Sequence, residues 1–287
     1  MSSLPKVRCR PIESGDLDAV ANLLARGFPA RPRQYWANAL ERLATRAVPE
    51  GCPRFGYMLD AEGLPVGVLL LIFSRAGSGA AAPIRCNVSS WYVDPSYRTY
   101  GAALVSAAMK LKHVSYVNIS AAQHTWPILK AQGYSRYSDG QFVAVPLLSR
   151  SVGRVRARRF AEDGPDRALP EYDLMRAHVE AGCVGIVCES EAGPAPFLFV
   201  RRRLEMAPFG VVQLVYCRDT DDLVRCAGAL GRQLLLVGAI CVICDSTAPI
   251  AGLAGRFFAD KTPRYFRGPN PPRLNDLSFT ELVLFGP

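Results

Sequence analysis

The sequence predicts an α/β protein with a mixed α+β sheet, organised as two similar halves. Apolar runs of strand length alternate with segments whose apolar residues recur at positions i, i+3, i+4 and i+7, as on one face of a helix. In each half, a group of antiparallel strand signals precedes an alternation of strands and helices. A length of 287 residues also fits two domains better than one. Together these observations favour two domains with the same order of elements.

The first half, residues 1–148, is expected to form one domain. Asp16 can cap a first helix, and the turn that ends in Gly63 separates two apolar runs, which indicates a hairpin. The expected strands are 6–12, 55–59, 66–73, 84–93, 115–120 and 141–147. The expected helices are 17–24, 35–43, 101–111 and 125–132.

The second half, residues 171–287, repeats this order with little similarity of residues. The expected strands are 184–190, 196–200, 211–217, 239–244 and 279–285. The expected helices are 171–180, 221–236 and 249–258. We therefore expect a second domain of related architecture.

Positive charge is concentrated in the first half and in the segment that follows it. The chain has a formal net charge of +9. Residues 1–148 contain 16 basic and 9 acidic side chains, residues 149–170 contain 6 and 3, and residues 171–287 contain 12 and 13. Residues 149–170, with five arginines within 150–159, are interpreted as an Arg-rich linker. An anionic partner would therefore meet the first half or this linker.

The composition excludes several classes of protein. A content of 49% apolar and 21% charged residues excludes a disordered or collagen-like chain. The longest apolar runs are well short of the roughly 20 residues that cross a bilayer, and the charged N-terminus does not suit a secretory signal. We therefore expect a cytoplasmic protein without a membrane partner. Nine cysteines with one CxxC pair, and three scattered histidines, supply no set of zinc ligands, so we expect reduced thiols and no metal.

One stretch carries the clearest functional pattern, Trp91-Tyr-Val-Asp-Pro95-Ser-Tyr-Arg98-Thr-Tyr-Gly101-Ala-Ala103. A strand ends near Val93, Pro95 forces a turn, and an Arg-x-x-Gly-x-Ala segment opens an apolar helix. Such a loop is expected to leave backbone N–H groups unpaired at a helix N-terminus, where small side chains let a phosphate approach. We therefore predict a pyrophosphate cradle in which Gly101 and Ala103 permit close approach.

In these residues the chain resembles the GNAT superfamily of acyl-CoA-dependent N-acyltransferases. Their signature places an Arg/Gln-x-x-Gly-x-Gly/Ala loop after a strand that ends in Leu/Trp-Tyr-Val-x-Pro, and residues 91–103 match it. The order of elements in residues 5–148 matches that fold as well. The resemblance implies a GNAT-like acyl-CoA-binding domain in residues 1–148 and a degenerate GNAT-like domain in residues 171–287.

The resemblance also implies roles for individual residues. The main chain of Tyr92 and Val93 would pair with the pantetheine arm of acetyl-CoA or another acyl-CoA, like an added strand. The Val93 amide, or a near neighbour, would polarise the thioester carbonyl. The loop would hold the CoA pyrophosphate, and its residues are Arg98, Thr99, Tyr100, Gly101, Ala102 and Ala103.

The residues that usually transfer protons in this superfamily are missing. Family members often carry a carboxylate base where this sequence has Asn87, and a tyrosine acid where it has Leu129. An asparagine side chain cannot accept a proton at neutral pH. The substitutes are His124, whose imidazole suits acid–base work, and Ser90, which could order a water molecule. Both residues also have ordinary interpretations, as an exposed or helix-capping histidine and as a strand hydroxyl bonded to water or backbone.

Three functions follow from these patterns. The leading interpretation is an N-acetyltransferase or related acyltransferase, in which a small-molecule or peptide amine attacks the acyl-CoA directly. The alternative is a catalytically inactive CoA-binding scaffold or sensor, because both proton-transfer positions are altered. Binding of nucleic acid or another anionic surface through the Arg-rich linker is less favoured, because no aromatic residues interleave with the arginines. The second half has three carboxylates and no glycine at 218–222, so no phosphate is expected there. We expect a monomer or a homodimer.

Overall fold

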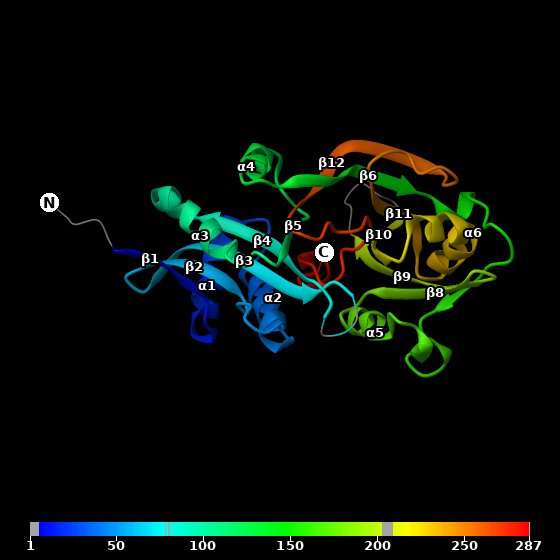
Figure 1. Ribbon diagram of the computed structural model, residues 1–287, viewed down its shortest axis with the longest axis horizontal. Helices are drawn as coiled ribbons and strands as arrows, with labels where there is room; N and C mark the ends of the chain where they lie inside the picture. The colour runs from blue at the N-terminus through cyan, green and yellow to red at the C-terminus, as the bar shows by residue number, and fades with distance from the viewer. Residues whose placement is uncertain (1–5, 78, 80, 203–208, 287) are drawn as a thin grey trace. The chain divides into compact units, whose positions relative to one another are not determined.

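The computed structural model describes residues 6–77, 79, 81–202 and 209–286, and their contacts divide the chain into two compact units. Unit 1 comprises Met1–Asn118 and Arg267–Asn270, and unit 2 comprises Ile119–Phe266 and Pro271–Pro287. In each unit, helices pack on mixed β structure, which confirms the predicted fold class (Figure 1).

Unit 1 contains five strands in the order β1-β2-β3-β4-β5 among its described residues. The first four are antiparallel neighbours, and β5 runs parallel to β4. The strands are β1 (Val7–Pro11), β2 (Gly56–Ala61), β3 (Leu64–Arg75), β4 (Ile84–Val93) and β5 (Ser115–Asn118). The helices are α1 (Leu17–Gly27), α2 (Arg33–Thr45) and α3 (Gly101–Ala108). Each was expected within a few residues of these bounds.

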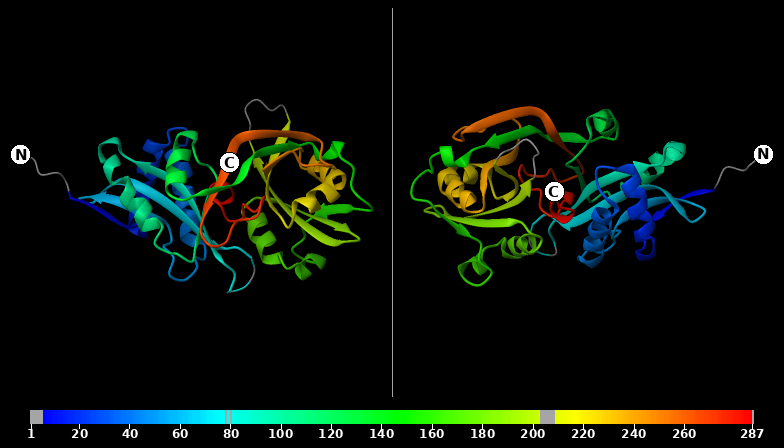
Figure 2. Two further views of the ribbon diagram at one scale, coloured as in Figure 1. Left: turned by 45° about the horizontal axis from the view of Figure 1, so that its top comes forward. Right: turned by 180° about the vertical axis from the view of Figure 1, so that it is seen from behind.

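The helices of unit 1 cover both faces of its strands. Figures 1 and 2 show α1 and α2 on one face and α3 on the other. Successive side chains of a strand point to opposite faces, and the end of β4 follows this rule. The ring of Tyr92 packs on α1, where a methyl group at Gly27 would come within 2.4 Å of it. Trp91 and Val93 lie beneath Gly101, the first residue of α3. The end of β4 is therefore fixed from both sides.

Unit 2 has the strand order β12-β6-β11-β10-β9-β8-β7 among its described residues. The strands β10 and β11 are parallel, and the other neighbouring pairs are antiparallel. The strands are β6 (Ser135–Ala144), β7 (Arg156–Arg159), β8 (Val184–Ser190), β9 (Gly193–Arg202), β10 (Gly210–Cys217), β11 (Ala239–Ser246) and β12 (Gly255–Arg267). The helices are α4 (Trp126–Ala131), α5 (Tyr172–Glu180), α6 (Thr220–Leu236) and α7 (Glu281–Leu284).

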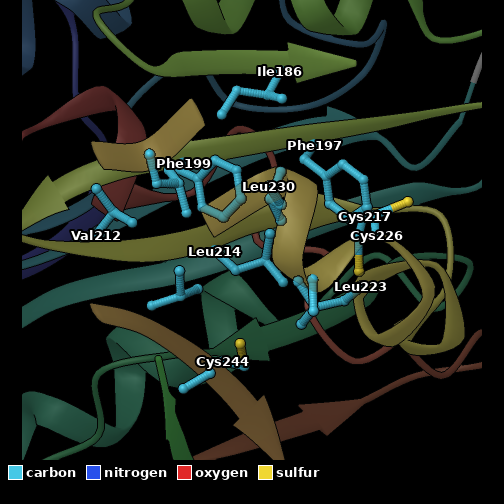
Figure 3. Close-up of a cluster of buried hydrophobic side chains, with 14 of the residues drawn as sticks. Ile186, Phe197, Phe199, Val212, Leu214, Cys217, Leu223, Cys226, Leu230 and Cys244 are labelled. Carbon is cyan, nitrogen blue, oxygen red and sulfur yellow. The ribbon is translucent and has the colours of Figure 1, made fainter. Parts of the chain in front are cut away.

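A large apolar core fills unit 2 between α6 and its strands (Figure 3). Leu223, Cys226 and Leu230 recur on one face of α6 at helical spacing and are fully buried. They contact aromatic side chains of β9, such as Phe197 and Phe199. Full burial of each large apolar side chain contributes about 1.5–3 kcal/mol, so this core anchors the second half.

The predicted domain boundary at residue 148 lies inside unit 2. Strand β6 pairs with β11 on one side and with β12 on the other, so a strand from the first half of the sequence belongs to the second unit. It also begins earlier than the predicted 141–147, because its polar N-terminal half pairs with β12, and it ends before the 3-10 turn that starts at Pro146. Residues 149–170, interpreted as an Arg-rich linker, contain β7, which pairs with β8.

Two predictions for the C-terminal region are wrong. The expected helix 249–258 is a turn followed by β12, because Gly252 has a φ of +83° and Gly255 needs an extended backbone close to β6. A methyl group on Gly255 would lie 2.3 Å from the Val143 carbonyl oxygen. The expected strand 279–285 contains the short helix α7, because Phe279 has a φ of +54° and Thr280 then starts a helical turn.

The cysteines are all free thiols, and seven of the nine are buried. Within the described residues, no three His, Cys, Asp or Glu side chains lie close enough together to hold a metal ion. None of the described helices has both the length and the apolar character that crossing a bilayer requires.

The segment after β6 packs on α6 through two glycines. A methyl group on Gly231 would lie 2.4 Å from the Leu147 amide nitrogen, and one on Gly228 would lie 2.7 Å from the Ser149 carbonyl oxygen. Both contacts are with backbone, which has little freedom to move aside. Residues 147–149 are therefore fixed against the helix.

We predict that Gly231→Ala lowers the free energy of unfolding by about 1–3 kcal/mol, because the added methyl group forces the two backbones apart. This loss would appear although alanine favours a helix interior by about 1 kcal/mol over glycine. Urea unfolding followed by circular dichroism measures the change. Gly15→Ala is the control, because no atom lies within 4 Å of the added methyl group. A Gly231→Ala variant as stable as Gly15→Ala would contradict the tight packing.

Candidate functional site

The strand β4 leaves its parallel neighbour part of the way along its length. The ladder between them joins Arg85 to Ser115, Cys86 to Tyr116 and Asn87 to Val117. Strand β5 ends at Asn118, whereas β4 continues to Val93. In the described part of the chain, β3 is the only strand in register with the end of β4, through Tyr92 and Val93. The opposite edge of Tyr92 and Val93 therefore presents main-chain groups that an extended ligand could pair with.

A β-bulge directs this end of β4. In the register with β3, Ser89 lies opposite Leu70 and Tyr92 lies opposite Val68, so one extra residue is inserted in β4. Ser90 takes up the bulge with a φ of +52°. Bulges bend a strand and redirect its end, and they are frequent beside functional sites. The bulge thus coincides with the point at which β4 separates from β5.

Unit 2 contains the same divergence, but there the chain itself fills it. The parallel ladder of β10 and β11 ends at the pair Gln213 and Ile243, and β10 continues to Cys217. Beyond that point, the Leu277 N–H donates to the Val215 carbonyl oxygen at 2.7 Å. Residues 276–277 therefore act as an added strand on the free edge of β10.

The inserted segment is also tied to β11. The side-chain oxygen of Asn275 accepts the Asp245 N–H at 2.7 Å, and its side-chain nitrogen donates to the Asp245 carbonyl oxygen at 3.2 Å. Asn275 and Leu277 are fully buried. The opening between β10 and β11 is thus closed by residues 275–277, which bond to both strands.

The segment between β4 and α3 is helical rather than an open loop. The 3-10 helix η2 (Pro95–Tyr100) continues directly into α3, with Pro95 in its first position. The Gly101 N–H donates to the Arg98 carbonyl oxygen. The expectation that the amides of this segment are unpaired is therefore wrong for Gly101, because Pro95 starts the helical hydrogen bonding before Arg98.

The side chains of the predicted cradle nevertheless leave its surface open. Those of Arg98, Thr99, Tyr100, Ala102 and Ala103 are exposed. Gly101 is buried, but a methyl group there would make ordinary contacts of 3.5 and 3.7 Å with Trp91 and Val93. Packing within the chain therefore does not require glycine at this position.

The predicted catalytic residues of unit 1 lie on β4. Asn87 is 2% exposed, and its side-chain nitrogen donates to the Val88 and Val117 carbonyl oxygens at 3.3 and 3.4 Å. It therefore acts as a donor at the last rung of the ladder. The Ser90 hydroxyl lies 2.9 Å from that of Ser89. Burial and the adjacent Asp94 carboxylate raise the pKa of Tyr92, so its phenol stays protonated at neutral pH.

His124, the third predicted catalytic residue, belongs to unit 2. It is exposed in the 3-10 turn η3 (Gln123–Thr125) that precedes α4. Leu129, at the position where the superfamily often has an acidic tyrosine, is buried in α4 and 6% exposed. Within unit 1, the structure therefore brings Asn87 and Ser90 onto the strand that leads to the 98–103 segment.

The N-terminus of α6, which follows β10 as α3 follows β4, is already occupied by a carboxylate. Asp219 caps the helix by accepting the Asp221 N–H at 3.0 Å. Asp221 and Asp222 lie in the first turn, where their charges are favoured by the helix dipole but would repel a phosphate. The prediction that no phosphate binds at residues 218–222 rests on these carboxylates, and the cap gives it a structural reason.

Sequence reasoning missed a half-buried acid in unit 2. Glu281 accepts a hydrogen bond from the Ser120 hydroxyl, and burial raises its pKa to about 7 against the opposing effects of that bond and of the Arg264 charge. Arg264 itself is 4% exposed and forms two hydrogen bonds of 2.9 Å with Asp245. No local pattern indicates this site, because Ser120 and Glu281 are 161 positions apart.

Comparison with known proteins bears on the fold. No protein-family model matches the chain, and no curated protein sequence matches it. Among solved structures, a GCN5-related N-acetyltransferase from Anabaena variabilis is similar with a TM-score of 0.59 and 9% identity, over 91% of this chain and 72% of that one. Another, from Kribbella flavida, is similar with a TM-score of 0.54 and 16% identity, over 92% of this chain and 71% of that one. A conserved protein of unknown function from Enterococcus faecalis is similar with a TM-score of 0.56 and 12% identity, over 96% of this chain and 74% of that one.

At these identities the similarity concerns architecture. Over most of its length the chain has the fold of the GCN5-related N-acetyltransferases, which confirms the fold predicted from the motif at 91–103. Two similar halves are compatible with this result. The site residues and the reaction stay predictions.

We predict that Glu281 makes the protein less stable as the pH rises from about 4.5 to about 7. The folded chain keeps the Glu281 proton over this range, whereas the unfolded chain releases it from its ordinary pKa of 4.5, so the free energy of unfolding falls. Glu281→Gln removes this titration and keeps an oxygen for the Ser120 hydroxyl. The variant should gain about 1–3 kcal/mol relative to the wild type between pH 5 and pH 8.

Urea titrations of both proteins at pH 5 and pH 8 measure this gain. Other titrating groups contribute equally to both proteins, so their effect cancels when the two free energies of unfolding are subtracted. Asp18→Asn is a control, because Asp18 is an exposed carboxylate of unit 1. Equal pH dependence of the Glu281→Gln variant and the wild type would show that Glu281 is ionised in the folded protein.

Proposed function

We propose that the protein is an acyl-CoA-dependent N-acyltransferase whose CoA site lies in unit 1, along the free edge of β4 and at the junction of η2 and α3. The transferred group would be acetyl or another short acyl group, and the acceptor a small-molecule or peptide amine. The observation that carries this proposal is the divergence of β4 from β5 after Asn87.

Unit 2 supports this interpretation of the divergence. There the corresponding free edge is paired by the main chain of residues 276–277, which supports an extended chain as the partner of the opening in unit 1. A pantetheine arm carries amide groups that could pair with Tyr92 and Val93 in the same way, because it too is an extended chain. The side chains of both residues pack on the helices of unit 1, so the main chain is what remains for a ligand.

The 98–103 segment fits a pyrophosphate if η2 changes its hydrogen bonds. A 3-10 helix has poorer hydrogen-bond geometry than an α-helix and rarely extends beyond three or four residues, whereas η2 has six. A phosphate offers charge-assisted hydrogen bonds, which are about twice as strong as bonds between neutral groups. We propose that the Gly101 amide turns from the Arg98 carbonyl oxygen to the phosphate, with the Arg98 guanidinium beside it. Unwinding would thus accompany binding.

Neither predicted catalytic residue of unit 1 is a strong candidate for the proton-transfer step. Asn87 donates to backbone carbonyl oxygens and cannot take a proton from the attacking amine. We propose that the amine arrives neutral and that positioning beside the thioester provides most of the acceleration. The Asn87 contacts equally favour the second candidate, a CoA-binding scaffold without turnover. Acyl transfer to any member of a broad panel of amines decides for the enzyme.

We predict that acetyl-CoA binds with micromolar affinity and that Gly101→Glu abolishes binding. A side chain longer than a methyl group meets Trp91 and Val93 and must displace the junction of η2 and α3 to reach solvent, where its charge would repel the phosphate. Arg98→Gln should weaken binding about tenfold, because one charge-assisted contact is lost. Isothermal titration calorimetry on the full chain measures both effects.

Two controls separate loss of the site from loss of the fold. Gly101→Ala should bind CoA and unfold like the wild type, because its methyl group finds ordinary contacts. Gly15→Glu adds the same charge at an exposed position of unit 1 and should leave affinity unchanged. The absence of CoA binding to the wild type, or equal binding to Gly101→Glu, would reject the proposed site.

A further inference from the structure

Unit 2 contains a depression of about 890 Å³ beside α6 that is lined by four arginines. These are Arg150, Arg154, Arg156 and Arg232. Its volume lies within the range of about 300–1,000 Å³ that is usual for small-molecule pockets. Every lining residue belongs to unit 2, so the predicted CoA cradle at 98–103 contributes nothing to it.

The backbone that carries Arg150 and Arg154 is anchored, although its composition is that of a linker. Gly228 and Gly231 of α6 hold it close to the helix. Three hydrogen bonds fix it further: Ser149 Oγ accepts the Ala254 N–H at 2.8 Å, Ser151 Oγ accepts the Ala229 N–H at 2.9 Å, and the Val152 N–H donates to the Arg225 carbonyl oxygen at 2.9 Å. An anchored backbone limits the ordering entropy that a ligand must overcome on binding.

In the described part of the chain, the four guanidinium groups of the depression have no carboxylate within ion-pair distance. By contrast, other described arginines of unit 2, such as Arg136, Arg158 and Arg218, form ion pairs. Among the described residues, no ion pair involves any of the four, and all four side chains are exposed. The contrast indicates that this surface keeps its positive charge available.

The neighbouring carboxylates only partly neutralise this charge. Glu189 lies opposite Arg156 in the register of β7 and β8, but its carboxylate contacts the Arg158 guanidinium at 2.8 Å. Arg158 also binds Asp166 at 2.6 Å. Glu191 is the other acidic residue at the depression. The four arginines thus face two carboxylates, of which one is engaged elsewhere.

The chemistry of the depression selects phosphate groups. Guanidinium groups bind phosphate through two parallel hydrogen bonds, and one phosphate can engage two of them. Four arginines therefore suit two or more adjacent phosphates. No aromatic side chain lines the depression in the described part of unit 2, so nothing there would stack on a nucleic-acid base. We infer that this depression is a second anion site, which binds a soluble small molecule bearing adjacent phosphate groups.

Tripolyphosphate is a suitable probe, because it presents adjacent phosphates and nothing else. Calorimetry with the full chain at low salt should show saturable binding of one ion at this depression, weakening as salt is raised. The double variant Arg154→Gln/Arg232→Gln should weaken binding at least tenfold. Its thermal unfolding should match that of the wild type, because neither side chain forms an ion pair within the described residues.

Arg159→Gln is the matched control. Arg159 is an exposed arginine of the same strand as Arg156, it forms no ion pair among the described residues, and it does not line the depression. Its replacement should change the affinity less than twofold. Equal weakening by Arg159→Gln and by the double variant would indicate attraction to general positive charge and would overturn the proposal.

Two further measurements separate this site from the CoA site and from nucleic acid. Tripolyphosphate should still bind Gly101→Glu with the affinity of the depression, whatever that variant does to CoA binding. Loss of binding in Gly101→Glu but not in the double variant would assign the phosphate to unit 1 and overturn the inference. The inference also fails if tripolyphosphate does not bind, or if only a single-stranded RNA of about 20 nucleotides, longer than the site of one binding module, competes for the arginines.

Discussion

The polar groups of a strand edge need partners, and this constraint shapes both units of the chain. In each unit a central strand separates from its parallel neighbour after an amide residue, Asn87 in β4 and Gln213 in β10. A bulge lies just beyond each point of separation. In unit 2 the free edge is paired by the chain itself through Leu277. The same fold therefore creates one closed opening and one that a ligand can complete.

The helices that follow these strands explain why only one half is suited to an acyl-CoA. Asp219 accepts the Asp221 N–H at the N-terminus of α6, and Asp221 and Asp222 place two more carboxylates in the first turn, where they would repel a phosphate. Pro95 begins η2 with no side-chain acceptor on its amides, and Arg98 adds positive charge. The difference between the halves thus depends on a few residues at one turn. The strands and helices around that turn are alike in order.

Much of the fold could be predicted from the sequence, because β4 and α6 have strong periodicity and clear ends at Pro95 and Asp219. The sequence-based predictions were wrong where contacts between distant residues override the local apolar pattern. The apolar spacing at 249–258 imitates a helix, yet the approach of β6 at Gly255 requires a strand. The motif at 91–103 located the candidate site. It could not reveal that η2 is helical, nor that residues 275–277 close the opening of unit 2, because these features depend on conformation and on contacts far along the chain.

The Arg-rich segment is a second case in which the local sequence did not predict the conformation. Its composition resembles that of a flexible linker, and nothing in residues 149–159 alone indicates order. Order comes from α6, where Gly228 and Gly231 let the backbone approach closely enough for Ser151 to reach the Ala229 amide. Once the backbone is fixed, exposed arginines from the segment and from α6 must stay near one another despite their repulsion. Keeping like charges together costs free energy unless an anion offsets it, and this cost is the physical reason to look for a ligand there.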